Sequence, residues 1–236
     1  MSPQLNDALV SLRAPDSFAA EQYQALRLKI EWLRRVQNVH VLAISSPRLG
    51  EGKTVTAINL AGAHAESDRV LLIDADLRRP SVGPQLRLDE IGAPGLADAL
   101  SDERLELAHL IRRVDGIPFA IVLAGAASAP IHELLRSPRL DVLLQQARQQ
   151  FDLVVIDTSP LIPVTDPAVM ARAIDGMLVV VAANDTPRKL LGESLNLLDP
   201  SKVIGIVFNR AHRPLYGHYH GDYSRFPKGS AGSRVG

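Results

Sequence analysis

The sequence predicts an α/β protein in which helices cover both faces of a mostly parallel β-sheet. Short runs rich in β-branched residues alternate with longer segments of helical periodicity, which is the pattern of consecutive βαβ units. Several of these short runs are apolar on both faces, as strands are when helices cover a parallel sheet from both sides. A third observation is a glycine-rich loop that joins the first short run directly to a helical segment. These observations favour right-handed crossovers and a parallel sheet.

The apolar pattern divides the chain into the expected elements. Strands are expected at residues 39–45, 69–75, 119–125, 152–158, 177–183 and 202–208. Helices are expected at residues 17–33, 53–66, 138–150, 166–174 and 186–198. The first of these helices is amphipathic. The last has Thr186 as its expected N-cap and Pro187 in its first position.

The composition argues against several classes of protein. The chain of 236 residues carries 26 basic and 26 acidic side chains, so its net charge does not favour nucleic acid or an anionic membrane as a partner. It has no cysteine, which excludes disulfides and thiolate chemistry and fits a reducing compartment. No apolar run approaches the roughly 18 residues of a membrane span, and no signal peptide is visible. We therefore expect a soluble, cytoplasmic protein without direct membrane insertion.

Residues 45–54 read SSPRLGEGKT and lie between the first expected strand and a helix. Such a loop turns backbone N–H groups toward a polyphosphate, and the helix N-terminus adds its positive end. The usual P-loop pattern requires glycine at position 47, where this chain has Pro47, so the Walker motif is deviant. We expect Lys53 to reach the outer phosphates and the Thr54 hydroxyl to bind Mg²⁺. The residues assigned to nucleotide binding in this loop are Gly50, Glu51, Gly52, Lys53, Thr54 and Val55.

Three aspartates follow expected strands. Asp74 and Asp76 come at the end of the second strand in LLIDADLRRP, and Asp157 ends a later strand in LVVIDTSP. Ligands of open parallel sheets bind at the carboxyl ends of the strands, and strand alternation places Asp74 and Asp76 on one side. Any one of these residues could cap a turn or a helix. Three carboxylates facing a Lys/Thr loop favour ATP or ADP with Mg²⁺, and hence a P-loop NTPase.

Three segments together resemble the bacterial tyrosine autokinases (BY-kinases) of capsule and exopolysaccharide export. They are SSPRLGEGKT, VLLIDADLRRP and FDLVVIDTSPLIPVTD, at residues 45–54, 70–80 and 151–166. Similar segments at residues 93–100, 123–144 and 203–211 extend the likeness over most of the chain. These kinases have a P-loop ATPase fold related to the MinD/ParA group. The resemblance implies an ATP-dependent protein-tyrosine autokinase that regulates polysaccharide polymerisation or export.

The resemblance also implies roles for individual residues. Lys53 and Thr54 would hold the phosphates and Mg²⁺, and Asp157 would hold Mg²⁺ directly or through water. Asp74 and Asp76 would complete the metal site, with Asp74 accepting the tyrosine proton. The residues assigned to catalysis are Lys53, Asp74, Asp76 and Asp157, and those assigned to the metal are Thr54, Asp74 and Asp157.

The C-terminal part of the chain carries the remaining implied sites. Asn209 and Arg210 would lie against the adenine. Three of the four tyrosines follow close together, and the resemblance makes them acceptors that are phosphorylated on a neighbouring subunit: Tyr216, Tyr219 and Tyr223. They lie in a glycine-rich segment without apolar periodicity, which we expect to be flexible. The alternatives are a spacer with incidental tyrosines and a metal site formed by His218, His220 and Asp222.

We expect three parts along the chain and assembly into a homo-oligomer. The parts are an N-terminal segment with the amphipathic helix at residues 1–37, a P-loop ATPase/kinase domain at residues 38–211 and a tyrosine-containing tail at residues 212–236. The first helix of the family often carries E-x-x-R-x-x-R, a motif tied to assembly. Here Glu21 and Arg27 remain as the expected oligomer interface, but Gln24 replaces the middle arginine.

The resemblance implies a partner as well. The activator would be a membrane-spanning polysaccharide chain-length or co-polymerase protein, a separate polypeptide that recruits the kinase to the inner face of the cell membrane. Two other functions stay open at this point. One is a ParA/MinD-like ATPase switch, in which Arg48 stands where those relatives carry a signature lysine. The other is a degenerate kinase that acts as a scaffold without forming phosphotyrosine.

Overall fold

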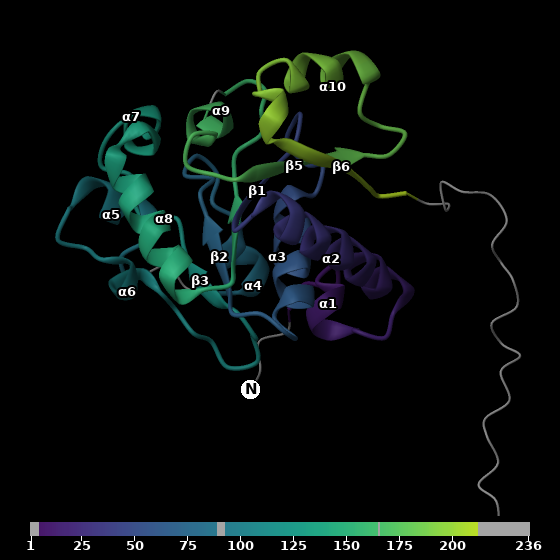
Figure 1. Cartoon of the computed structure of the whole chain (residues 1–236), viewed down its shortest axis with the longest axis horizontal. Helices are drawn as coiled ribbons and strands as arrows, with labels where there is room; N and C mark the ends of the chain where they lie inside the picture. The colour runs from purple at the N-terminus through teal and green to yellow at the C-terminus, as the bar shows by residue number, and fades with distance from the viewer. Residues whose placement is uncertain (1–4, 89–92, 165, 212–236) are drawn as a thin grey trace, which may run out of the picture.

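The strands assemble into one parallel sheet (Figure 1). A computed structural model of the chain describes residues 5–88, 93–164 and 166–211. Among these residues, six strands form a sheet in the order β3-β2-β4-β1-β5-β6, and all neighbouring strands run parallel. The strands are β1 Val41–Ser45, β2 Val70–Asp74, β3 Ala120–Val122, β4 Leu153–Asp157, β5 Gly176–Ala182 and β6 Val203–Asn209. Each overlaps a segment in which the sequence predicts a strand, so the α/β fold is confirmed.

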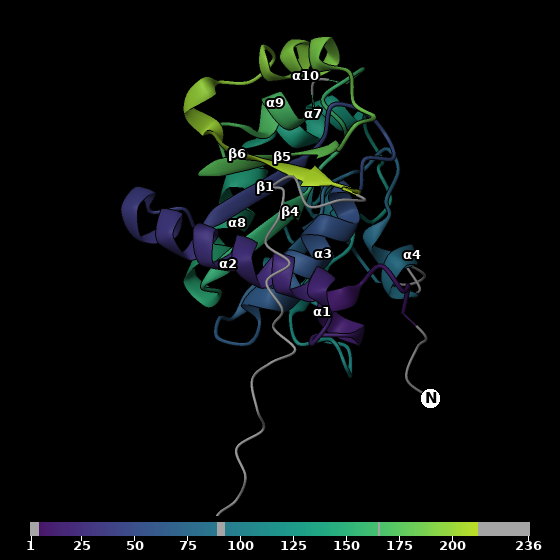
Figure 2. The same cartoon turned by 90° about the vertical axis from the view of Figure 1, so that its right-hand side faces the viewer.

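Helices cover both faces of the sheet, and Figure 2 shows α9 and α10 on one side with α1, α2 and α3 on the other. One layer contains α1 Val10–Arg13, α2 Phe18–Gln37, α3 Lys53–His64 and α4 Val82–Leu86. The other contains α5 Leu96–Ser101, α6 Leu107–Leu110, α7 Ile131–Arg136, α8 Pro138–Gln150, α9 Asp166–Met170 and α10 Arg188–Leu195, followed by the short 3₁₀ turn η1 Pro200–Lys202. Within the described ranges, none of these helices combines the length and apolar character needed to cross a bilayer.

Alternate residues of the central strands pack into two separate apolar layers. In β1, Val41 and Ala43 belong to the layer that includes α8, whereas Leu42 and Ile44 belong to the layer that includes α3. Successive side chains of a strand point to opposite faces, so a strand covered on both sides must be apolar throughout. All five residues of β1 are buried accordingly. Polar groups can therefore gather only at the ends of the strands or beyond them.

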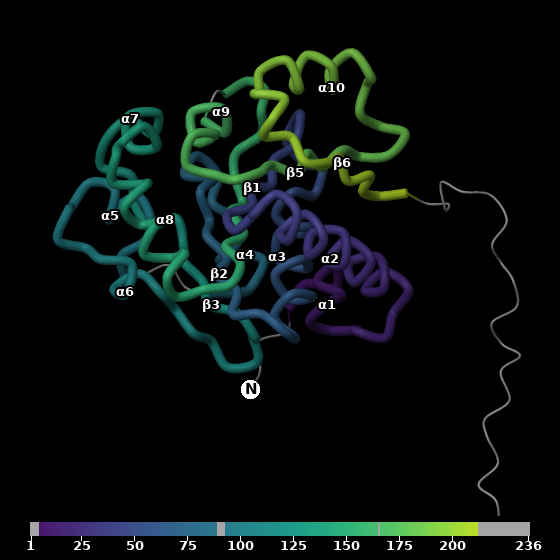
Figure 3. The backbone as a smooth tube through the Cα atoms, in the orientation of Figure 1, coloured from purple at the N-terminus to yellow at the C-terminus, as the bar shows by residue number. Residues whose placement is uncertain are grey.

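The long helix α2 lies against α3 (Figure 3). Ser17 caps the N-terminus of α2 by accepting the Ala20 N–H. Ile30, on the inner face of α2, is buried. The sequence predicts an end at residue 33, but the helix continues to Gln37. It stops there because Asn38 adopts a left-handed conformation with a φ of 54°.

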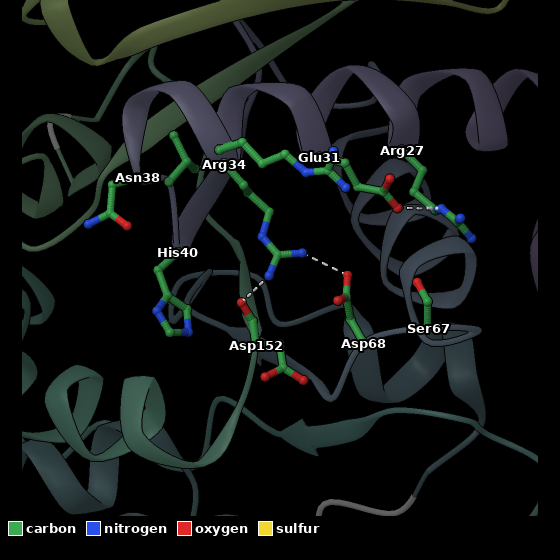
Figure 4. Close-up of a pocket in the computed structure, with 10 residues that line it drawn as sticks. Arg27, Glu31, Arg34, Asn38, His40, Ser67, Asp68 and Asp152 are labelled. Atoms are coloured by element: carbon green, nitrogen blue, oxygen red, sulfur yellow. Dashed lines mark hydrogen bonds and ion pairs between the residues drawn. The ribbon is translucent and has the colours of Figure 1, made fainter.

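A polar hollow of about 640 Å³ lies between α2 and the amino-terminal edge of the sheet (Figure 4). Arg34 crosses it and donates to the Asp68 carboxylate at 2.7 Å and to the Asp152 carbonyl at 2.6 Å. Arg27 pairs with Glu31 at 2.8 Å on its rim. Ligands of parallel sheets bind at the opposite edge, and these charged groups already pair with one another. We therefore interpret the hollow as structural: the contacts of Arg34 across it attach α2 to the loops before β2 and β4.

The start of α10 differs from the prediction. The sequence predicts Thr186 as its N-cap, but the helix begins at Arg188 and its N-cap is Pro187. The Thr186 hydroxyl instead accepts the Ala182 N–H at 3.0 Å and donates to the Glu51 carboxylate. Both its oxygen and its proton are engaged elsewhere, so the predicted cap is wrong.

His64 gives the fold a predictable response to acid. Its ring is fully buried at the end of α3, where Nδ1 lies 3.0 Å from the Asp68 carboxylate. Burial lowers the pKa of His64 below its usual value, Arg34 acts in the same direction, and Asp68 and Glu31 oppose it. Because the unfolded chain then binds a proton more readily than the folded chain, this contribution to stability is present above about pH 6.5 and is lost as the pH falls.

We expect the melting temperature of the protein to fall by a few degrees more than that of His64→Gln when the pH is lowered from about 8 to about 5. Thermal unfolding followed across this range would measure the difference. His132 is 57% exposed, so His132→Gln should follow the unmodified protein. Parallel profiles for His64→Gln and the unmodified protein would contradict the expectation.

Candidate nucleotide site

The loop between β1 and α3 has a conformation that only glycine adopts easily. Gly50 and Gly52 have φ values of 81° and 94°, and α3 begins at the next residue, Lys53. A Cβ on Gly52 would lie 2.1 Å from Nδ2 of Asn209, so a larger residue there would displace the Asn209 side chain. The sequence pattern of a glycine-rich loop leading into a helix is thus present in three dimensions.

Lys53 and Thr54 meet two aspartates at the carboxyl edge of the sheet. The Lys53 ammonium lies 2.8 Å from the Asp76 carboxylate and 3.5 Å from that of Asp157. The Thr54 hydroxyl donates to Asp157 at 2.6 Å. All four side chains are at most 9% exposed. The structure therefore brings together four of the residues that the sequence predicts for the phosphate and metal site. Their chemical roles stay predictions.

Asp74 lies in the same cluster but has different partners. β2 and β4 pair in register, so Asp74 lies directly beside Asp157. One of its oxygens accepts the N–H of Asp76 at 3.1 Å, and the other accepts the N–H groups of Ser81 and Val82, each at 2.9 Å. Asp74 thereby holds the loop that follows β2, and this loop presents Asp76 to Lys53. Its predicted role as proton acceptor stays a prediction.

The electrostatics of the cluster fit a bound cation. Burial raises the pKa of Asp74 to about 7, and the adjacent Asp157 charge adds to the effect. Burial likewise raises the pKa of Asp157 to about 6, against the opposing influence of Lys53 and Thr54. The pKa of Lys53 is raised because Asp157 and Asp76 outweigh the effect of its burial. Three carboxylates share one ammonium, and hard oxygen donors of this kind suit Mg²⁺. Thr54 and Asp157 would hold the metal, with Asp76 and Asp74 beside it.

The remaining residues predicted to bind nucleotide border this cluster. Nδ2 of Asn209 donates to the Glu51 carbonyl at 2.9 Å, and its Oδ1 accepts the N–H of Arg210. Arg210 is exposed and has a φ of 60°. Val55 is half-buried in the first turn of α3, and Glu51 is buried with its carboxylate turned toward Thr186. Contact with the adenine stays a prediction for Asn209 and Arg210.

Two features of the site were not predicted from the sequence. The Ser81 hydroxyl lies 2.8 Å from that of Thr54, so Ser81 touches both Thr54 and, through its N–H, Asp74. Arg78 forms a two-point ion pair with the buried Asp166, at 2.6 and 3.1 Å, which ties the loop after β2 to the start of α9. Arg78 and Asp166 lie in segments quoted for the resemblance, which was the available signal, whereas Ser81 is the residue that follows one of these segments.

The residues predicted for assembly are placed differently from one another. Glu21 is exposed, whereas Arg27 donates to Glu66 at 3.2 Å and pairs with Glu31 within its own chain. Gln24 also donates to Glu66, at 2.9 Å. Their role in an oligomer stays a prediction. The predicted acceptors and the alternative metal site lie outside the described residues: Tyr216, Tyr219, Tyr223, His218, His220 and Asp222.

Comparison with protein families and curated sequences shows which proteins this chain resembles. A family described as an AAA domain matches residues 39–195. The succinoglycan biosynthesis transport protein ExoP of Rhizobium meliloti is 36% identical over 213 residues, covering 87% of this chain and 27% of ExoP. The tyrosine-protein kinase ptk of Acinetobacter johnsonii is 32% identical over 216 residues, covering 90% of this chain and 29% of that kinase. The chain thus spans less than a third of the length of these two relatives.

Other relatives are similar in size. The tyrosine-protein kinase YwqD of Bacillus subtilis is 28% identical over 217 residues, covering 89% of this chain and 90% of YwqD. Among solved structures, the kinase domain of the Escherichia coli tyrosine kinase ETK has a TM-score of 0.78 and 28% identity, covering 89% of this chain and 84% of that domain. The BceF tyrosine kinase domain has a TM-score of 0.76 and 26% identity, covering 85% and 81%.

A glycine-rich loop with Lys53 and Thr54 at the carboxyl edge of a parallel sheet defines the class of P-loop ATPases. Within that class, several of the relatives named above are tyrosine kinases of bacteria. The chain belongs to the BY-kinase family of P-loop ATPases.

Proposed function

We propose that this chain is an ATP-dependent protein-tyrosine autokinase that regulates the polymerisation or export of an exopolysaccharide or capsule. The observation that carries the proposal is the meeting of Lys53 and Thr54 with Asp76 and Asp157 at the carboxyl edge of the sheet. The names of the relatives support the rest, because two are tyrosine-protein kinases and a third is a succinoglycan biosynthesis transport protein.

The chemistry that we propose is phosphoryl transfer from ATP to a tyrosine hydroxyl. The bond between the tyrosine oxygen and the γ-phosphorus forms as the bond to the ADP oxygen breaks, so the protein must chiefly position the groups and neutralise charge. Lys53 and the loop N–H groups would hold the phosphates, and Thr54 and Asp157 would hold Mg²⁺, which supplies charge neutralisation when bound. A tyrosine hydroxyl has a pKa of about 10 and needs a base. Asp76 and Asp74 are the candidates to take its proton.

The proposed acceptors are the clustered tyrosines, phosphorylated on a neighbouring copy of the chain in a homo-oligomer: Tyr216, Tyr219 and Tyr223. Each phosphate adds about −1.5 to −2 charges, so phosphorylated C-terminal segments would repel one another and favour dissociation. We further propose that a membrane-spanning polysaccharide chain-length or co-polymerase protein activates the kinase and brings it to the inner face of the membrane.

Labelling with γ-labelled ATP and Mg²⁺, in the presence of the cytoplasmic part of such a partner, tests the proposal. The unmodified protein should form phosphotyrosine, and the variant with Tyr216, Tyr219 and Tyr223 all changed to Phe should lose at least about 90% of it, because only hydroxyl groups accept the phosphate. Tyr23→Phe is the matched control, since Tyr23 is the fourth tyrosine and lies half-buried in α2. Release of the label only as free phosphate would instead indicate a ParA/MinD-like ATPase switch.

A further inference from the structure

Glu51 is a buried acid inside the loop to which we assign phosphate binding. Its side chain is 1% exposed and lies between the two glycines with positive φ. A carboxylate close to a polyphosphate is electrostatically unfavourable, and burial of an uncompensated charge adds to the cost. The position of Glu51 therefore requires specific partners that hold its charge away from the nucleotide.

One of those partners comes from the loop between β5 and α10, and the other is Arg48 of the phosphate loop itself, whose guanidinium Nε lies 3.5 Å from Oε1 of Glu51. The Thr186 hydroxyl donates to Oε1 of Glu51 at 2.5 Å. The same hydroxyl oxygen accepts the N–H of Ala182 at the end of β5, at 3.0 Å, which leaves its proton for Glu51. The other carboxylate oxygen accepts the backbone N–H of Arg48 at 3.3 Å. One buried carboxylate thus joins the phosphate loop to the end of β5.

The main chain of Glu51 is held from the neighbouring strand. Asn209, at the end of β6, donates to the Glu51 carbonyl at 2.9 Å. A trans peptide is planar, so fixing this carbonyl also fixes the N–H of Gly52, which points the opposite way. Loops of this kind bind phosphates through correctly directed N–H groups. The Glu51 side chain is therefore held by Thr186 in the loop after β5, and its main chain by Asn209 at the end of β6.

A second link between the same two loops lies at the surface. The Arg48 guanidinium pairs with the Asp185 carboxylate at 2.7 Å, but these side chains are 41% and 64% exposed. Exposed ion pairs contribute little because water screens them. The buried contact between Thr186 and Glu51 must therefore provide most of the restraint.

We propose that Thr186 is a positioning residue for nucleotide binding, which acts through Glu51 to hold the phosphate loop in its binding conformation. The inference rests on the proposed function, because it assumes that the loop takes a nucleoside di- or triphosphate. Thr186 touches no phosphate itself. Its hydroxyl matters, whereas its methyl group does not.

Calorimetric titration with MgADP, using the full chain, tests this directly. Thr186→Val keeps the shape of the side chain but removes the hydroxyl, and we expect it to weaken MgADP binding about tenfold, the effect of losing one hydrogen bond to a charged group. Thr186→Ser keeps the hydroxyl and should bind within about twofold of the unmodified protein. Asp185→Asn breaks only the exposed pair and should also stay within about twofold. Thr186→Val should also melt a few degrees lower, because it leaves the buried Glu51 carboxylate with one partner fewer, whereas Thr186→Ser and Asp185→Asn should melt close to the unmodified protein.

The outcomes separate the two proposals. Unchanged MgADP affinity in Thr186→Val would overturn the positioning role and leave the proposed function intact. Equal weakening in Thr186→Val and Thr186→Ser would also overturn it, because the hydroxyl would then not be the group that matters. An unmodified protein that gives no heat with MgADP would remove the proposed function and, with it, the basis for this inference.

Discussion

Lys53→Met is expected to reduce phosphotyrosine formation by about a thousandfold, the largest effect of any single substitution considered. The Lys53 ammonium is the one cation within ion-pair distance of both Asp76 and Asp157 among the described residues. Methionine is of similar length but carries no charge, so the variant loses both the proposed contact to the outer phosphates and the counter-charge of the carboxylates. Labelling with γ-labelled ATP would measure the loss.

The electrostatics of the site amplify this effect. The pKa values of Asp74 and Asp157 are already raised to about 7 and about 6 with Lys53 in place, and Lys53 lowers both. Without the ammonium, both carboxyl groups would hold protons more tightly near neutral pH and would bind Mg²⁺ less well. The variant should therefore need a higher Mg²⁺ concentration and a higher pH for any residual activity.

The control for this experiment is another lysine on the same protein. Lys189 lies on α10 with its side chain 88% exposed, 3.9 Å from Glu193, so Lys189→Met should retain full labelling. Labelling of Lys53→Met within about tenfold of the unmodified protein would contradict the expectation, because it would mean that the backbone of the loop holds the phosphates without the ammonium.

The positions of the strands along the chain could be predicted well from the sequence, because a sheet covered on both faces requires continuous apolar runs, whereas their order in the sheet was not predicted. The clearest difference concerns β3, for which the sequence predicts residues 119–125, whereas the strand is Ala120–Val122. The carbonyls of Leu123 and Ala124 accept the N–H groups of Leu96 and Ala97 at the start of α5. The apolar pattern continues past the strand because these residues remain buried, but their backbone has a different partner. Local periodicity cannot distinguish the two cases.

The sequence could predict the site residues that lie at strand ends, but not the contacts made by the loops that follow the strands. Aspartates at the carboxyl ends of parallel strands are expected to converge, and Asp157 does lie against Thr54. The sequence also places Asp74 and Asp76 on one side by strand alternation, but β2 ends at Asp74, so alternation no longer applies to Asp76. The bond between Glu51 and Thr186 joins residues far apart in the chain. No local pattern predicts such a contact.

Asp74 at the end of β2 and Asp76 just after it have unequal surroundings, which lead to a second large expected effect. Asp76→Asn should reduce phosphotyrosine formation by about a hundredfold or more while changing stability little, because Asp76 contacts Lys53 and belongs to a crowded group of carboxylates. Asp74→Asn should lower the free energy of unfolding by about 2 kcal/mol, because the amide nitrogen cannot accept a bond from the loop N–H groups that Asp74 now binds.

Measuring both quantities in both variants separates a chemical role from a positioning role. Urea denaturation gives the free energies of unfolding, and labelling with γ-labelled ATP gives the activities. Asp74→Asn should lose activity together with stability, because a loosened loop no longer presents Asp76 to Lys53. If Asp74→Asn were as stable as the unmodified protein yet inactive, and Asp76→Asn remained active, then Asp74 would take the tyrosine proton. The three N–H groups around Asp74 would in that case serve to orient a base, since a carboxylate that accepts them still has lone pairs available.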